Sequence, residues 1–206
     1  MGKLDMSKSF FFEGSKSFLI YSLIYAAAIS GAFAKTDASK GPEPVDKWFA
    51  GLKKSFVPKF KFIEIYIQDI RGVANQTVWL VAESNISATS PTFFGQVYLA
   101  DNILTTTPKF ESTRLGRAQG FGAFSDLEVP ALFYSWNLVF TSGEYNGSTL
   151  SISGRNQVLD YSSEFSIVGG TGHFRMASGV AIGANFLPRD ARGISVLKYT
   201  LYFTYY

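Results

Sequence analysis

The chain has 206 residues, of which 47% are hydrophobic and 17% are charged, and its formal net charge is +3. This composition is enough for a sizeable hydrophobic core and excludes a disordered polyelectrolyte. The absence of cysteine excludes a thiol nucleophile, an iron–sulfur cluster, a cysteine-based zinc site and a disulfide scaffold. Since His173 is the single histidine, a metal site with several histidine ligands is excluded as well. We therefore expect no metal and no other cofactor, and the small net charge does not indicate a nucleic-acid partner.

The first 34 residues have the pattern of a secretory signal peptide. Three lysines precede an apolar run over residues 18–29, and the motif Ala32-Phe33-Ala34 follows it. A membrane anchor is the alternative, but the run is short for crossing a bilayer. We expect residues 1–34 to be removed, which places the protein in the extracellular space with no membrane attachment after cleavage.

Three N-x-Ser/Thr sequons agree with a secretory route. Their acceptor residues are Asn75, Asn85 and Asn146. Asn146-Gly147 is also a favoured two-residue hairpin turn, which would expose this asparagine. All three asparagines are therefore predicted glycosylation sites.

The rest of the chain is predicted to be one β domain that follows a short lead-in segment. Residues 35–59 have little periodicity, and Trp48, Phe49 and Leu52 could make one short helical turn or a patch that packs onto the body. From residue 60 onward no stretch has a helical stripe with caps, and strand-like runs are separated by Gly, Asn, Pro and Ser clusters. These runs cover residues 60–70, 77–82, 93–100, 119–124, 132–141, 148–153, 164–168, 180–185 and 194–206.

An antiparallel barrel or sandwich is the predicted architecture for residues 60–206. Several runs are apolar on both faces, above all residues 197–206. One face would fill a barrel interior, and the other would have to bury against another subunit. The barrel is therefore the favoured alternative, in a homo-oligomer.

The stretch Gly169-Gly170-Thr171-Gly172 resembles a phosphate-binding loop only superficially. Such a loop needs a Lys-Ser/Thr pair that opens a helix, whereas His173-Phe174-Arg175 follows here between strands. A tight turn that needs positive φ explains the glycines without a ligand. His173 directly after the turn is expected to be solvated rather than a catalytic base.

Asp69 is the strongest candidate for a catalytic residue. It shares its strand parity with Ile63, Ile65 and Ile67, so its carboxylate is expected on the same apolar face. Desolvation in a pocket disfavours the charged form of a carboxylate, which suits a proton donor or shuttle. The alternative is that Asp69 only caps the end of the strand. Ile67 and the adjacent Gln68 are further candidates for lining the pocket.

A second group of candidates lies in residues 116–121. Arg117 and Gln119 share one parity and are flanked by small residues, and Phe121 continues this parity. Polar side chains in such a position line a cavity or satisfy buried backbone groups at a barrel rim. Both interpretations remain open, and Arg155 in a later strand is one more pocket candidate.

Four sequence blocks, in this order and spacing, resemble the plant dirigent proteins across residues 60–206. The blocks are residues 94–97 with 101–105 (FGQV and DNILT), 115–120 (LGRAQG), 143–150 with 154–156 (GEYNGSTL and GRN), and 168–179 (VGGTGHFRMASG). The resemblance implies an all-β fold, an eight-stranded antiparallel β-barrel of the kind also found in allene oxide cyclase. It also implies a homotrimer or dimer in the plant apoplast.

The resemblance implies that the protein guides the stereoselective coupling of phenoxy radicals in phenylpropanoid and lignan biosynthesis. An external laccase or peroxidase makes the radicals, so that the protein itself needs no redox centre. Some relatives instead dehydrate a closed-shell isoflavanol to a pterocarpan through a quinone methide. A defence-related barrel that binds phenolics without selective chemistry is a third hypothesis. The partner is in each case a phenolic small molecule or its radical.

Compared position by position, the chain is not a close match to the pinoresinol-forming branch. The His-Asp pair of the family is Gln68-Asp69 here, so the acid remains. The tyrosines of the strand after the AQG block are absent from Phe121-Gly122-Ala123-Phe124. Where that branch has a second pocket aspartate, this chain has the triplet Gly154-Arg155-Asn156, which contains no acid. An arginine of that branch is replaced by Ser163.

Overall fold

The computed structural model describes residues 42–206. The predicted signal peptide, residues 1–34, and the beginning of the lead-in segment lie outside the described residues. Within this range the elements in chain order are α2 (Val45–Leu52), β1 (Lys59–Ile70), β2 (Val78–Ala82), β3 (Val97–Thr105), β4 (Arg114–Phe124), β5 (Ala131–Phe140), η2 (Gly143–Tyr145), β6 (Ser148–Gln157), β7 (Ser162–Thr171), η3 (Gly172–Phe174), β8 (Ser178–Leu187) and β9 (Ile194–Tyr205).

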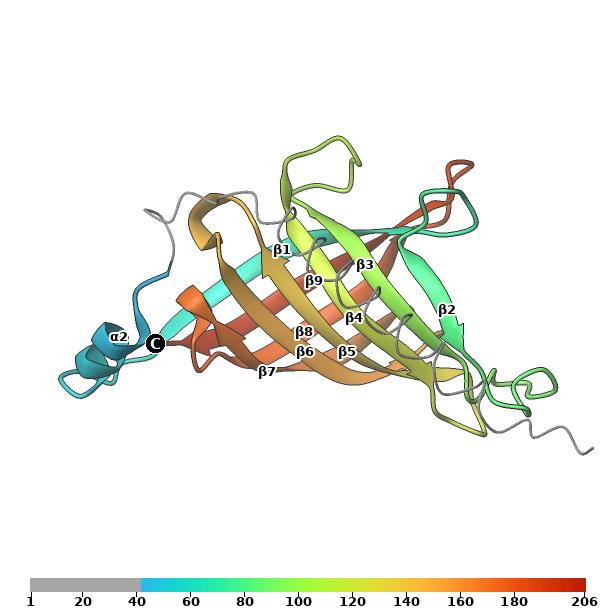
Figure 1. The fold of residues 1–206 in the computed structure, drawn as a ribbon, viewed down its shortest axis with the longest axis horizontal. Coiled ribbons are helices and arrows are strands. Elements are labelled where there is room, and N and C mark those ends of the chain that lie inside the picture. The colour runs from blue at the N-terminus through green and yellow to red at the C-terminus, as the bar shows by residue number, and fades with distance from the viewer. Residues whose placement is uncertain (1–41) are drawn as a thin grey trace, which may run out of the picture. The chain divides into compact units, whose positions relative to one another are not determined.

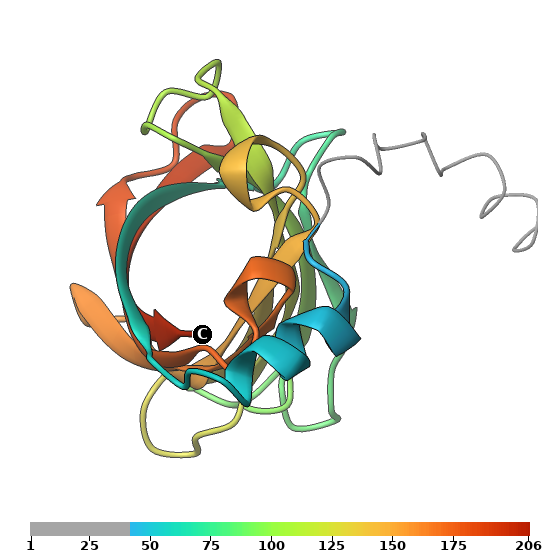
Figure 2. The same ribbon diagram turned by 90° about the vertical axis from the view of Figure 1, so that its left-hand side faces the viewer.

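Eight of these strands close into an antiparallel barrel, as the sequence predicts. Within residues 42–206 the sheet order is β1-β9-β8-β7-β6-β5-β4-β3-β2, and β3 pairs back to β1 (Figure 1, Figure 2). The β1–β9 ladder runs without a break from Lys59 opposite Tyr205 to Ile70 opposite Ile194. The closing pair is shorter, because β1 meets β3 over three residue pairs only. The remaining part of the β3 edge pairs with β2.

The two-residue period of the strands separates the barrel interior from its outer face. In β5, Trp136, Leu138 and Phe140 are buried, while Phe133, which has the opposite parity, is exposed. Successive side chains of a strand point to opposite faces, so this alternation follows directly from the sequence. The interior is therefore built from every second residue of each strand.

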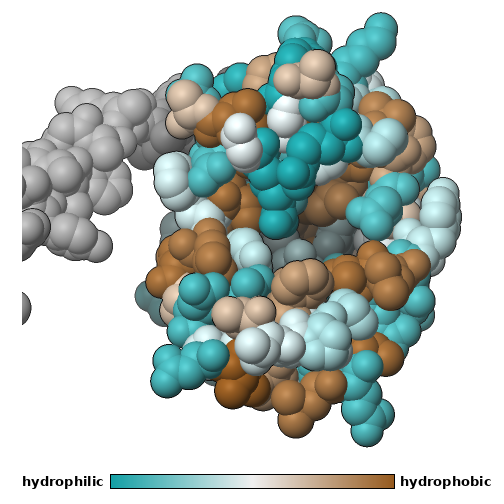
Figure 3. Space-filling view, turned by 90° about the vertical axis from the view of Figure 1, so that its right-hand side faces the viewer, coloured by the Kyte–Doolittle hydropathy of each residue, from teal (hydrophilic) through white to brown (hydrophobic). Residues whose placement is uncertain are grey.

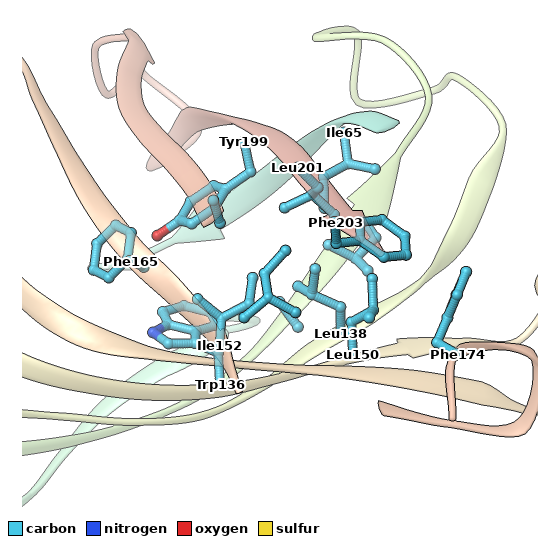
Figure 4. Packing of buried hydrophobic residues seen from close by; sticks show 14 of the residues in the cluster. Ile65, Trp136, Leu138, Leu150, Ile152, Phe165, Phe174, Tyr199, Leu201 and Phe203 are labelled. Atoms are coloured by element: carbon cyan, nitrogen blue, oxygen red, sulfur yellow. The ribbon is translucent and has the colours of Figure 1, made fainter. Parts of the chain in front are cut away.

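Packed side chains fill the barrel at the end where β1 begins. Phe174 of η3 is fully buried there, and its ring lies 5.5 Å from that of Phe140 and 5.3 Å from that of Phe203 (Figure 4). Leu138, Leu150, Ile152 and Leu201 continue this core towards the middle of the barrel. This end is closed, and the space inside the barrel lies towards the opposite end.

The lead-in segment contributes α2, which lies at the closed end (Figure 2). The Trp48 indole nitrogen donates a hydrogen bond of 3.1 Å to the carbonyl oxygen of Tyr206. The ring of Phe56 stacks on that of Tyr206 with 4.1 Å between the centroids. Among residues 42–206, no helix has the length and apolar character needed to cross a membrane.

The glycine-dense stretch at residues 169–172 forms the end of β7 and the start of η3. Gly172 has a φ of +63°, and a Cβ there would lie 2.6 Å from the hydroxyl oxygen of Ser148. That hydroxyl accepts a hydrogen bond of 3.0 Å from the backbone nitrogen of His173. The turn accounts for the glycine, since only glycine adopts this backbone readily in so little space. His173 itself is exposed.

Candidate functional site

A cavity of about 220 Å³ opens at the end of the barrel opposite α2. Figure 3 views this end, which is hollowed at its centre between hydrophilic and hydrophobic residues. Strands β1 and β5 to β9 and the adjoining loops supply the lining. The lining residues are Asp69, Arg71, Leu132, Tyr134, Asn156, Val158, Asp160, Tyr161, Ser162, Phe165, Gly183, Ala184, Asn185, Arg189, Ser195, Leu197 and Tyr199.

Asp69 lines this cavity and is paired with Arg71. The inward parity of Ile65 and Ile67 continues to Asp69, which is only 5% exposed. Arg71 Nε donates to Asp69 Oδ1 at 2.8 Å, and Arg71 Nη2 donates to Asp69 Oδ2 at 3.0 Å. Such a two-bond pair fixes both side chains in one plane and is among the stronger polar interactions in proteins. The carboxylate therefore stands in the cavity with a bound counter-charge.

The guanidinium of Arg71 is held on a second side by an aromatic ring. Its Cζ lies 5.6 Å from the centroid of Tyr98. Burial by itself opposes the charge of Arg71, but the hydrogen bonds and the charge of Asp69 outweigh it, so the pKa of Arg71 lies above its ordinary value. Arg71 is therefore a fixed cation in the wall of the cavity.

Two tyrosines bring phenolic hydroxyl groups into the cavity. Burial raises the pKa of Tyr134, which the nearby charge of Arg71 only partly offsets. Burial raises the pKa of Tyr199 far above its ordinary value as well. Both hydroxyls therefore remain protonated over the physiological range and can donate a hydrogen bond to a bound oxygen.

Glycines on neighbouring strands leave the space that these two rings occupy. A Cβ on Gly122 of β4 would lie 2.7 Å from Cε1 of Tyr134. A Cβ on Gly183 of β8 would lie 2.7 Å from Cζ of Tyr199. Contacts this short are sterically excluded. The Tyr134 ring therefore needs a glycine at position 122, and the Tyr199 ring needs one at position 183.

A smaller cavity of about 70 Å³ adjoins the first one. Arg71, Leu132 and Tyr134 line both cavities. We call the larger one the outer cavity and the smaller one the inner cavity. The remaining walls of the inner cavity are Val78, Tyr98, Ala100, Gly122, Phe124 and Trp136.

The structure separates Asp69 from its two predicted neighbours in β1. Ile67 is buried in the hydrophobic core and does not line either cavity. Gln68 points to the outer face because of the strand alternation, and the loop after β3 covers it. Its Nε2 donates to Thr105 Oγ1 at 2.9 Å and to the carbonyl oxygen of Pro108 at 3.3 Å.

The candidates in β4 also lie on the outer face. Arg117 Nε donates to Asp101 Oδ1 at 2.7 Å, and Gln119 Nε2 donates to the same oxygen at 3.1 Å. Phe121 is exposed. The inward positions from Ala118 to Gly122 are small, so this stretch of β4 contributes space rather than side chains to the interior, and Phe124 at the end of the strand lines the inner cavity. None of the three candidates lines either cavity.

Arg155 is on the outer face of β6, where its Nη2 donates to Asp126 Oδ2 at 2.6 Å. Its neighbour Asn156 has the opposite parity and lines the outer cavity. The Asn156 side-chain oxygen accepts a hydrogen bond of 2.8 Å from the Ser163 hydroxyl. In this triplet Gly154 and Asn156 face inward, and Asn156 supplies the inward side chain, which sequence reasoning did not select.

Sequence reasoning also missed Arg71, Tyr134 and Tyr199. The strand parity that selects Asp69 would have found Arg71, since it lies two residues further on. No local signal distinguishes Tyr134 or Tyr199 from other aromatics in their strands. Of the sequon asparagines, Asn75 and Asn85 are exposed in turns, and Asn146 is half-buried beside η2.

Comparisons with known proteins agree with this barrel. The family model described as "Dirigent-like protein" matches residues 60–204. The chain is 34% identical over 184 residues to Dirigent protein 21 of Arabidopsis thaliana, an alignment that covers 89% of this chain and 93% of the relative. It is also 34% identical over 149 residues to pterocarpan synthase 1 of Glycyrrhiza echinata, over 72% of this chain and 79% of that one.

Solved structures give the same result. A pterocarpan synthase dirigent protein superimposes with a TM-score of 0.66 at 33% identity, over 72% of this chain and 86% of that one. A second pterocarpan synthase dirigent protein gives a TM-score of 0.64 at 35% identity, over 72% of this chain and 96% of the other. The likeness therefore covers the barrel in both sequence and structure.

Proposed function

The chain belongs to the dirigent family, and we propose that its barrel holds one phenolic molecule so that the product forms with one handedness. In the reaction that we favour, the molecule is a phenoxy radical made by an external laccase or peroxidase. A second radical then couples to it. The barrel supplies position and proton transfer, while the oxidase supplies the oxidation.

The observation that carries this proposal is a cavity that is closed at its inner end and open at the rim. The packed core around Leu138 and Leu150 lies below it, and Tyr134, Phe165 and Tyr199 provide aromatic walls. A planar ring that lies against such a wall has one face covered by protein and the other turned towards the opening. A partner can therefore approach from one side only, which is the geometric requirement for stereoselective coupling.

The polar groups of the outer cavity suit the proton transfers that follow coupling. Each radical contributes one electron to the new carbon–carbon bond, which leaves a quinone methide. When a hydroxyl oxygen adds to the quinone methide, its proton must leave and the carbonyl oxygen must gain one. The Asp69 carboxylate can accept a proton, and the Tyr134 or Tyr199 hydroxyl can donate a hydrogen bond to the carbonyl oxygen.

The test is the chirality of the dimers. Purified protein is incubated with coniferyl alcohol and a laccase, and the products are separated by chiral chromatography. We expect an excess of one enantiomer over the mixture formed by the laccase alone. A racemic mixture identical to the control without the protein would exclude monolignol coupling.

The second candidate function is the dehydration of a closed-shell isoflavanol. The relatives named pterocarpan synthase favour it, and the same side chains would serve. A leaving hydroxyl takes a proton and departs as water, a phenolic hydroxyl loses its proton, and the quinone methide then closes to a ring. Turnover of an isoflavanol without any oxidant would select this function, and phenolic binding without product bias in either assay would select a binding barrel.

Proteins of the dirigent family are generally extracellular. We propose that this chain is secreted to the apoplast through the signal in residues 1–34 and is glycosylated at Asn75, Asn85 and Asn146. Loss of a mass shift on glycosidase treatment of the Asn→Gln variants would identify the occupied sites.

A further inference from the structure

Positive charge is concentrated in the segment that contains α2 and the start of β1. Residues 43–61 contain five lysines and two acidic residues. This excess of three positive charges equals the formal net charge of the whole chain, +3, so the rest of the chain is balanced. Two of the five lysines are paired, Lys47 with Glu43 at 3.4 Å and Lys61 with Glu144 at 3.9 Å.

The other three lysines have no salt bridge within the part of the chain that the structure describes. They are Lys53, Lys54 and Lys59. Arg175, which follows η3, is a fourth cation without a salt bridge in residues 42–206, and its Cζ lies 5.2 Å from the centroid of the Trp48 ring. Figure 2 shows α2 and η3 side by side at the closed end of the barrel. Four cations without an acidic partner therefore gather at this end.

The acidic groups nearby do not cancel these cations. Glu43 is already bound by Lys47, and Asp46 lies in the first turn of α2. Tyr206 is the last residue of the sequence and carries the terminal carboxylate. Two negative charges thus stand against four positive ones, and this end of the barrel remains cationic.

Exposed aromatic rings lie between the cations. Phe49 is 53% exposed, and the Nζ of Lys53 lies 5.4 Å from the centroid of its ring. Phe56 is 57% exposed, although one side of its ring stacks on Tyr206 at 4.1 Å. These rings and the four cations form one surface, which we call the basic patch. Its members are Phe49, Lys53, Lys54, Phe56, Lys59 and Arg175.

The packing of α2 does not suit a lipid surface as the partner. A helix that lies in a membrane interface turns its apolar face to the lipid. In α2 the two residues that are not exposed are Trp48 and Leu52, and the Trp48 indole is fixed to the barrel by its hydrogen bond to Tyr206. The apolar side of this helix is therefore already used by the barrel.

Cations that alternate with exposed rings suit a linear acidic polysaccharide. The carboxylates of uronic acid units are attracted by lysine and arginine. The face of an aromatic ring is electron-rich and attracts the polarised C–H groups on the face of a sugar ring. A polyuronate offers both kinds of contact along one chain, whereas a neutral polysaccharide leaves the four cations without a partner.

We propose that the basic patch binds a linear acidic polysaccharide, a polyuronate, outside the cell. The outer cavity opens at the end of the barrel opposite α2, so a polymer bound to the patch leaves that opening free. The patch anchors the barrel, and its binding does not depend on which reaction the outer cavity supports.

The test compares two ligands that differ only in charge. The probes are an oligogalacturonide and its full methyl ester of the same length, and calorimetry measures their dissociation constants. In about 0.01 M NaCl we expect the acid to bind at least roughly tenfold more tightly than the ester, since several exposed ion pairs form at once. The preference should shrink in about 0.15 M NaCl, where screening is stronger. Equal affinities for acid and ester would overturn the proposal.

The variant Lys53→Gln/Lys54→Gln/Lys59→Gln removes three exposed charges from the patch. It should bind the oligogalacturonide roughly tenfold more weakly than the unaltered protein. The matched control removes three charges elsewhere and should bind almost as the unaltered protein does. It is Lys109→Gln/Arg114→Gln/Arg189→Gln, whose three cations also have no salt bridge among residues 42–206. Equal weakening in both variants would overturn the patch, because the total charge of the protein would then be responsible.

Two further measurements separate the rings from the charges and the polysaccharide from a lipid surface. Phe49→Ala should weaken oligogalacturonide binding by roughly two- to tenfold and leave its salt dependence unchanged. Unchanged affinity in this variant would overturn the role of the ring. Vesicles of phosphatidylcholine and phosphatidylglycerol in equal parts are the second probe. Binding to these vesicles without binding to the oligogalacturonide would overturn the proposal in favour of a lipid surface.

Discussion

Asp69 combines burial, a place in the cavity and a two-bond pair with Arg71, and its replacement therefore has two separable effects. Asp69→Asn keeps the size of the side chain but removes the charge that Arg71 faces. We expect the product bias to disappear, or the rate of isoflavanol turnover to fall by about 10²- to 10⁴-fold. We also expect a loss of about 1–3 kcal/mol in the free energy of unfolding, since charged hydrogen bonds are lost.

The control for Asp69 is Asp101→Asn on the outer face. Asp101 also pairs with an arginine, Arg117, at 2.7 Å, but it lines neither cavity. Chiral chromatography of products and urea unfolding should show full product bias and a small change in stability in this variant. Full activity in a folded Asp69→Asn protein would reduce Asp69 to a structural partner of Arg71.

Gly183 tests the aromatic wall formed by Tyr199. In Gly183→Ala the new Cβ would lie 2.7 Å from Tyr199 Cζ and 2.9 Å from Phe165 Cε2. We expect the Tyr199 ring to shift into the outer cavity, with weaker phenolic binding and a loss of about 1–3 kcal/mol in stability. Calorimetry and urea unfolding measure the two effects.

The matched variant is Gly169→Ala in β7, where nothing lies within 4 Å of the added Cβ. It should bind phenolics as the unaltered protein does, with equal or slightly higher stability. If both alanine variants behave alike, the close contact at Gly183 has no role in shaping the cavity.

At the scale of elements, the connection between β4 and β5 depends on Asp126. One carboxylate oxygen accepts hydrogen bonds from the backbone nitrogens of Glu128 at 2.8 Å and Val129 at 3.1 Å. The other accepts from Arg155 of β6 at 2.6 Å. The Arg155 hydrogen bond and these two backbone bonds lower the pKa of Asp126 to about 2. The carboxylate of Asp126 thereby links the β4–β5 connection to strand β6.

The pH dependence of this contribution has a definite sign. A carboxyl group whose pKa is lowered by folding stabilises the protein above its unfolded pKa of about 4, and the effect disappears as the pH falls towards 2. We expect Asp126→Ala to unfold at a lower temperature than the unaltered protein at pH 5–7, with the difference vanishing near pH 2. Thermal unfolding followed by circular dichroism measures it. A difference that persists unchanged at pH 2 would contradict this origin.

At the scale of the whole molecule, the outer face of the barrel carries two separate apolar stripes. One stripe crosses β2 to β5 and the other crosses β1 and β9, and all their members are exposed. The first consists of Trp79, Leu99, Phe121 and Phe133, and the second of Phe60, Phe62 and Tyr202. Two different patches on one subunit suit a heterologous contact that closes into a ring of identical copies.

We therefore propose a cyclic homo-oligomer in which the stripes meet. Light scattering after gel filtration should give the mass of a trimer for the unaltered protein. Tyr202→Lys should shift the mass towards the monomer, since a charge in a buried contact is costly. The control Val168→Lys changes an exposed apolar residue of β7 outside both stripes and should keep the oligomer. A monomeric unaltered protein would contradict the proposal.

The sequence by itself determined that the domain is built of antiparallel strands and that Asp69 shares one face with Ile63, Ile65 and Ile67, because both follow from the two-residue period of a strand. It also indicated the turn at residues 169–172 and the family. The start of β3 was placed too early, at residue 93 rather than Val97, since the aromatic pair Phe93-Phe94 belongs to a loop.

Only the tertiary structure decided which residues meet inside the barrel. Parity alone does not say which of the two faces of a strand is the inner one when both carry bulky or polar groups. Arg117, Gln119 and Arg155 thus point outward to carboxylates, while Arg71, Tyr134, Asn156 and Tyr199 line the outer cavity. Asp69 of β1 and Tyr199 of β9 line one cavity although their strands lie at opposite ends of the domain in sequence, and the barrel closes where β3 pairs with β1. The space itself comes from glycines opposite aromatic rings, and that relation exists only once the strands are paired.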